Sequence, residues 1–168
     1  MSIARLLGRR PELPFAEWGW QVRQFDLPRE GRVEFAQWRH PATSVTPMEQ
    51  AEVDGLRHWI APGDFAIDVG AHTGDTSVPM ALAAGPTGCV LALEPNRYAF
   101  AVLAANAALN RDKTHIAPRC LAAAESDGPL EFLYGDASYC NGGAPVGVWE
   151  PPRRKVPLPP PGRRPLAG

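Results

Sequence analysis

The sequence lacks the features that mark several classes of protein. It has only three cysteines, at scattered positions, and so shows neither a disulfide framework nor the paired spacing of a zinc site. No apolar run approaches the roughly 20 residues that cross a bilayer, and the basic start has no apolar stretch long enough for a signal peptide. The net charge of −1 gives no sign of a surface for nucleic acid or anionic membranes. We therefore expect a cytoplasmic protein without a metal, nucleic-acid or membrane partner.

Proline, in contrast, is abundant and unevenly distributed. The 168 residues suffice for one domain with a core, but seven of the nineteen prolines lie in the last eighteen residues, together with four arginines. Such a stretch has little to bury, so residues 144–168 are predicted to form a disordered or polyproline II tail. A proline-rich docking ligand and the product of a changed reading frame are the alternatives.

The N-terminal segment, residues 1–45, contains a predicted β-hairpin. "WGWQVRQFDL" and "RVEFAQWRH" are rich in aromatic and β-branched residues and flank the turn "PREG". We expect Trp18, Trp20 and Trp38 to pack the hairpin onto the main body. A helix should follow, with Thr46 as N-cap, Pro47 at its first position and Glu49 completing a capping box.

Residues 46–143 alternate between strand and helix patterns. Apolar runs at 65–70 and 89–94 indicate buried parallel strands, and each precedes a helix pattern, over 75–84 and 96–110. The helix at 96–110 should face inward with Tyr98, Ala101, Val102, Ala105 and Leu109. A third strand at 114–124 contains a proline, which suggests a sheet edge, and "LEFLYG" should form a short further strand. This order predicts an α/β fold with a Rossmann-like, doubly wound parallel sheet.

The turn in "IDVGAHTGDTS" follows the first of these parallel strands. Gly70 and Gly74 let the backbone approach a ligand, and the next helix directs free N–H groups at the turn. Glu94 ends the neighbouring strand, where a carboxylate can accept hydrogen bonds from both ribose hydroxyls. Ligands of such sheets bind at the carboxyl ends of the strands. We therefore predict a nucleoside-containing ligand; the alternative is a compact turn beside a solvated glutamate.

The details of the turn narrow the choice of nucleoside. The dinucleotide pattern G-x-G-x-x-G would need glycine where His72 stands, and no phosphate loop for nucleoside triphosphates is present. With Asp68 before it, the turn reads D-x-G-x-x-x-G. This resembles the first motif of the class I methyltransferases, which bind S-adenosylmethionine. "FAIDVGAHTGDTSVPMA", "VLALEPN", "AANAALN" and "DGPLEFLYGDASYCNGG" are similar to the FkbM group of that family.

The resemblance implies a cofactor, a reaction and a set of site residues. Asp68, Gly70 and Gly74 would form the methionine pocket, His72 and Thr73 would line it with backbone groups, and Glu94 would hold the ribose. Residues 122–125 would stand near the adenine. The reaction implied is transfer of a methyl group to a small-molecule hydroxyl acceptor, on a sugar or metabolite.

The same resemblance implies an incomplete C-terminal half. A fourth strand ending in a D-x-E-G motif is not found, so the far edge of the 65–69 strand should be bare and open to self-association. No residue is assigned as catalytic, although His72, Asp136 and Tyr139 are candidates for a base. The alternatives are a non-catalytic, truncated cofactor-binding half-domain and an NAD(P)-binding reductase domain.

Overall fold

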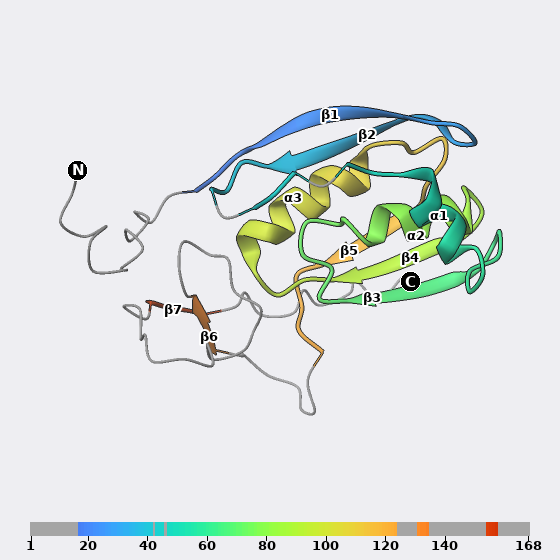
Figure 1. The fold of residues 1–168 in the computed structure, drawn as a ribbon. Helices are drawn as coiled ribbons and strands as arrows, with labels where there is room; N and C mark the ends of the chain where they lie inside the picture. Colours follow the sequence, from blue (N-terminus) through green and yellow to red (C-terminus); the bar gives the residue numbers. More distant parts are fainter. Residues whose placement is uncertain (1–16, 42, 46, 124–130, 135–153, 158–168) are drawn as a thin grey trace, which may run out of the picture.

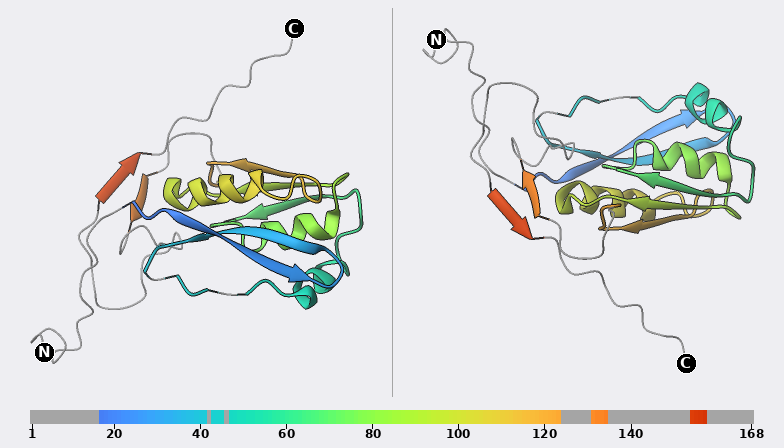
Figure 2. Two further views of the ribbon diagram at one scale, coloured as in Figure 1. Left: turned by 90° about the horizontal axis from the view of Figure 1, so that it is seen from above. Right: turned by 90° about the horizontal axis from the view of Figure 1, so that it is seen from below.

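Two β-sheets enclose a layer of helices (Figures 1 and 2). The structure, a computed structural model, describes residues 17–41, 43–45, 47–123, 131–134 and 154–157. A hairpin lies on one side of the helices and a parallel sheet on the other. The elements up to the last parallel strand are β1 (Trp20–Leu27), β2 (Gly31–Trp38), α1 (Gln50–Leu56), β3 (Phe65–Val69), α2 (Ser77–Ala84), β4 (Cys89–Leu93), α3 (Arg97–Ala108) and β5 (Ile116–Arg119).

The N-terminal hairpin is confirmed. β1 and β2 pair antiparallel from Trp20 opposite Trp38 to Leu27 opposite Gly31. The predicted packing of the tryptophans holds for Trp38, which is buried, and in part for Trp18, which is half-buried against the same cluster. It is wrong for Trp20, which is 46% exposed.

The start of α1 differs from the prediction. The helix begins at Gln50 after Glu49, whose side chain makes no capping bond, and Pro47 lies outside the helix, in chain without regular secondary structure. Thr46 lies outside the described residues. The Gln50 side chain accepts a hydrogen bond from the Arg29 N–H at 2.9 Å and donates one to Glu30 at 2.9 Å. Contact with the hairpin turn therefore replaces the expected capping box at this helix end.

The parallel sheet has the order β3-β4-β5, as the alternation predicts. Because successive strands are neighbours and crossovers between parallel strands are right-handed, α2 and α3 are expected on the same face of the sheet. Figure 1 shows both helices between this sheet and the hairpin. The described residues thus form one half of a doubly wound fold, in which β3 and β5 are the edges.

The prediction that β3 is buried is wrong for alternate side chains. Phe65, Ile67 and Val69 are 64%, 54% and 63% exposed. Ala66 between them packs against the core, so the alternation of the strand turns these three side chains to the other face of the sheet. Figure 1 shows none of the described helices on that face. Apolar character identified the strand, but the layer that would bury this side of it is not among the described residues.

The main core joins the hairpin to the helices and the parallel sheet. Leu27, Val33 and Phe35 of the hairpin share one buried cluster with Val78 of α2 and Val90 of β4. Seven of the eight residues of α2 are buried, because the helix is covered on both sides. In α3, the predicted inward face is partly wrong, since Ala101 is exposed whereas Ala99, Leu103 and Asn106 are buried.

A second antiparallel pair consists of β6 (Glu131–Tyr134) and β7 (Arg154–Pro157). The first of these confirms the short strand predicted in "LEFLYG". The second falls within residues 144–168, the stretch predicted to form a disordered or polyproline II tail, and the rest of that stretch lies outside the described residues. No helix in the described part of the chain is long and apolar enough to cross a membrane.

Candidate functional site

The glycine turn folds over the carboxyl end of β4. The N–H groups of Gly70 and Ala71 both donate to the Leu93 carbonyl, at 2.9 and 3.0 Å, and the Gly74 N–H donates to the Ala71 carbonyl at 2.8 Å. Gly70 and Gly74 have φ of +82° and +94°, which side chains strongly disfavour. Backbone geometry therefore favours glycine at both positions, whether or not a ligand binds.

The surroundings of the two glycines differ. Among the described residues, a Cβ added to Gly70 would meet no atom within 4 Å, so this end of the turn faces open space in that part of the chain. A Cβ on Gly74 would lie 3.0 Å from Leu103 Cδ1 and 3.6 Å from Asn106 Cβ, both in α3. Gly74 thus permits close packing of the turn on α3. Only Gly70 leaves room on the outside of the turn for another molecule.

Glu94 is fixed beside the turn, as strand-end placement predicts. One carboxylate oxygen accepts the His72 N–H at 2.8 Å, and the other accepts the Asn96 N–H at 2.6 Å. The residue is 6% exposed, and burial raises the pKa of its carboxyl, with the charge of Asp68 adding to the rise and the two N–H groups opposing it. The alternative of a solvated glutamate is therefore wrong.

Asp68 connects the end of β3 to the start of α2. Its carboxylate accepts the Ser77 hydroxyl at 2.6 Å. Thr76, the N-cap residue of α2, makes no side-chain capping bond, and the first turn of the helix carries no acidic residue. The carboxylate at this helix start therefore comes from Asp68 in β3 and not from the helix itself, and it lies beside the positive end of the helix dipole.

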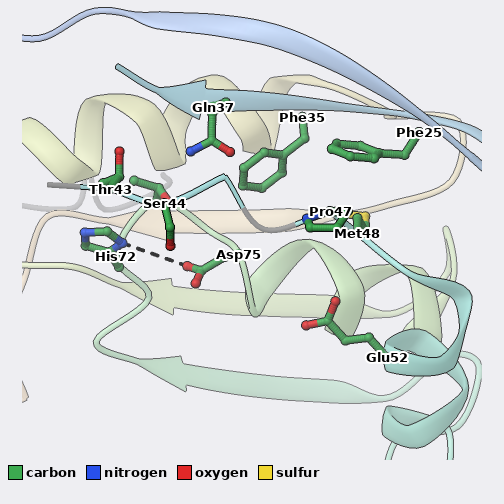
Figure 3. Close-up of a pocket in the computed structure, with 11 residues that line it drawn as sticks. Phe25, Phe35, Gln37, Thr43, Ser44, Pro47, Met48, Glu52, His72 and Asp75 are labelled. Atoms are coloured by element: carbon green, nitrogen blue, oxygen red, sulfur yellow. Dashed lines mark ion pairs between the residues drawn. The ribbon is translucent and has the colours of Figure 1, made fainter. Parts of the chain in front are cut away.

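His72 and Thr73 face a different side of the turn. Their side chains line a pocket of about 170 Å³ with residues of the hairpin, segment 43–48 and α1 (Figure 3). The His72 ring lies edge-on to Trp38 and 3.9 Å from the Asp75 carboxylate. Burial lowers the pKa of His72, because it disfavours the charged imidazolium. The charge of Asp75 acts to raise this pKa, and His40 acts to lower it further. A neutral imidazole is thus favoured near neutral pH.

The backbone groups expected to line the cofactor pocket are already engaged. The His72 N–H binds Glu94, and the Thr73 carbonyl accepts the amide of Asn106 at 2.8 Å. Sequence reasoning missed Asn106, although an asparagine within an alanine-rich helix that faces the core is a visible signal. The amide of this fully buried residue also bonds both backbone groups of Ala36 in β2.

Other candidates add little to this site. Asp136 and Tyr139 lie outside the described residues, as do residues 124 and 125 of the predicted adenine region. Ala122 and Ala123 follow β5 in chain without regular secondary structure. Within the described ranges, no group of three histidine, cysteine or acidic side chains could hold a metal ion.

Comparison with known proteins gives similarities of fold alone. No protein-family model and no curated protein matches the chain. Among solved structures, Pyrococcus horikoshii TYW2 in complex with MeSAdo is similar at 21% identity and a TM-score of 0.48. The Pyrococcus horikoshii protein PH0793, described as a transferase, is similar at 20% and 0.46. Each comparison covers 71% of this chain and 45% of the other, so the chain spans less than half of either protein. Because both TM-scores are below 0.5, a function for this chain rests on its own residues.

Proposed function

We propose that the chain binds S-adenosylmethionine and forms the cofactor-binding half of a methyltransferase. The observation that carries the proposal is the placement of Glu94. Its buried carboxylate, at the end of β4, is fixed by the N–H of His72 in the turn that follows β3. A glycine turn and a strand-end carboxylate are thus joined at one end of a parallel sheet, where nucleosides bind in such folds.

The residues present suit the chemistry of this cofactor. Gly70 leaves open space on the outside of the turn. Each carboxylate oxygen of Glu94 accepts one backbone N–H and keeps a second lone pair, so the group can still accept ribose hydroxyls. The cofactor supplies an electrophilic methyl group; Glu94 would hold its sugar, and Asp68 and Gly70 would lie beside its amino-acid end. The pocket at His72 is smaller than the ~300 Å³ common for ligand sites, so it cannot enclose the whole cofactor.

For the acceptor we propose a hydroxyl group on a sugar or small metabolite, in a cytoplasmic setting. Support comes from the sequence resemblance to the FkbM group. No described residue is assigned as the base that takes the hydroxyl proton. A chain that binds the cofactor without transferring the methyl group is the alternative, since the described sheet has only three parallel strands. The reductase alternative is disfavoured because His72 stands where the dinucleotide pattern requires glycine.

Two measurements test the proposal. Calorimetry should show that the chain binds S-adenosylhomocysteine and does not bind NAD. Binding of NAD alone would favour the reductase alternative. Transfer of a radiolabelled methyl group from S-adenosylmethionine to a pool of sugars and small alcohols then separates an active enzyme from a binding domain. Label that stays in the cofactor, despite binding, would favour the non-catalytic alternative.

We also propose that the edge of β3 pairs with a second copy of the chain. The Asp64 carbonyl accepts the Cys89 N–H of β4, and the Gly70 N–H donates to the Leu93 carbonyl of β4, both at 2.9 Å. Because the backbone groups of successive residues alternate between the two sides of a strand, those of Phe65, Ile67 and Val69 point away from β4. These three positions carry no charge or proline that would block pairing. Antiparallel pairing about Ile67 would place Phe65 opposite the partner's Val69 and satisfy the outward backbone groups in both copies.

A further inference from the structure

We propose that Asn106 is a positioning residue that couples the hairpin to the cofactor turn. The inference rests on the proposed function, because the turn is its proposed binding element. Asn106 lies in the last turn of α3 and is fully buried. Its side-chain amide contacts two segments far apart in the chain, β2 and the glycine turn.

The amide of Asn106 makes three hydrogen bonds. Its oxygen accepts the Ala36 N–H at 2.6 Å, and its nitrogen donates to the Ala36 carbonyl at 3.1 Å and to the Thr73 carbonyl at 2.8 Å. The two hydrogen bonds to Ala36 pair its N–H and its carbonyl, as the backbone of a neighbouring strand would do at the free edge of β2. The third bond holds the turn between Gly70 and Gly74 to the same amide, so displacement of β2 and displacement of the turn are coupled.

The packing around this amide supports the coupling. Gly74 lets the turn approach α3 so closely that its added Cβ would lie 3.6 Å from Asn106 Cβ. On the other side of the turn, His72 contacts Trp38, two residues after Ala36 in β2. The next residue, Thr73, is the one whose carbonyl Asn106 binds. The hairpin therefore holds two successive residues of the turn, one by an aromatic contact and one through Asn106.

Asn110 provides a matched control within the same segment. Its amide accepts the Glu34 N–H and donates to the Glu34 carbonyl, both at 2.8 Å. It thus binds the edge of β2 two residues before Ala36, and the structure gives it no hydrogen bond to the turn. Both amides hold the edge of β2 in the same way, so an effect on the turn that appears in the Asn106 variant alone is attributed to the third bond of Asn106.

The experiment compares Asn106→Ala with Asn110→Gly, in which glycine suits the positive φ of 52° at that position. Amide hydrogen exchange should show faster exchange of the His72 and Gly74 N–H groups in Asn106→Ala and no change there in Asn110→Gly. Affinity for S-adenosylhomocysteine should fall about tenfold in the first variant and less than about threefold in the second. If Asn106→Ala does not fold, Asn106→Ser takes its place.

The outcomes distinguish this inference from the proposed function. Equal exchange and equal affinity in the two variants would overturn the role of Asn106. If the unaltered chain binds no S-adenosylhomocysteine, the proposed function fails, but the exchange of the turn amides still decides whether Asn106 positions the turn. Faster exchange in the Asn106 variant alone, with a selective loss of affinity, supports both.

Discussion

The two glycines of the turn should respond differently to alanine. At Gly70 and Gly74 alike, a positive φ costs about 1–2 kcal/mol once a Cβ is present. At Gly74 the new Cβ also lies 3.0 Å from Leu103 Cδ1, and such overpacking adds about 1 kcal/mol, the low end of the usual range because the end of a leucine side chain can move. Gly70→Ala adds no such contact. Gly74→Ala should therefore unfold at a lower urea concentration than Gly70→Ala.

Ligand affinity should show the opposite order. A methyl group at Gly70 occupies the open space on the outside of the turn, where the cofactor is proposed to lie, so Gly70→Ala should weaken S-adenosylhomocysteine binding by about 1–3 kcal/mol. Urea titration followed by tryptophan fluorescence gives the stabilities, with unchanged m-values as the sign of a comparable unfolding transition. Equal stability losses, together with unaltered affinity in Gly70→Ala, would refute the distinction drawn between the two glycines.

Three further predictions concern other parts of the molecule. Arg57→Met should destabilise the fold by about 1–3 kcal/mol, because Arg57 binds Glu30 at 2.8 Å. Burial alone would raise the pKa of Glu30, but the hydrogen bonds from Arg57 and Gln50 lower it. The loss of stability in the variant should therefore be present above pH 4.5 and shrink as the pH falls below that value. The His72 imidazole should titrate below its ordinary pKa of 6.5 in NMR, since burial disfavours its charged form; a midpoint above that value would contradict the burial of the ring. Ile67→Lys should abolish concentration-dependent dimerisation in analytical ultracentrifugation, and an unaltered chain that stays monomeric at high concentration would argue against pairing through β3.

The sequence was sufficient for the parts of the fold that depend on local pattern. The alternation of apolar runs and helical periodicity predicted β3, α2, β4 and α3 in the right order, and the rule that parallel strands end at one edge placed Glu94 beside the turn. Burial depends on the layers that surround an element, so the exposure of Ile67 could not be seen from the apolar pattern alone.

The hydrogen-bond partners inside the site were not predictable in the same way. Asn106 binds Ala36 and Thr73, which are separated from it by 70 and 33 residues. The sequence pattern shows that Asn106 is a polar residue within a helix, but it does not predict that the helix lies between a hairpin and a glycine turn. The start of α1 was unpredictable for the same reason. Its first residue, Gln50, is held by hydrogen bonds to the distant hairpin turn and not by a capping residue next to it in the sequence.

The most direct test of the proposed site is the affinity of Glu94→Ala for S-adenosylhomocysteine, measured by calorimetry beside Glu52→Ala, a carboxylate in the neighbouring pocket. Loss of charge-assisted hydrogen bonds to the ribose should weaken binding by about 1.5–3 kcal/mol in Glu94→Ala, and Glu52→Ala should bind as the unaltered chain does. Circular dichroism confirms that both variants are folded. A folded Glu94→Ala chain that binds as tightly as the unaltered one would contradict the site proposed here.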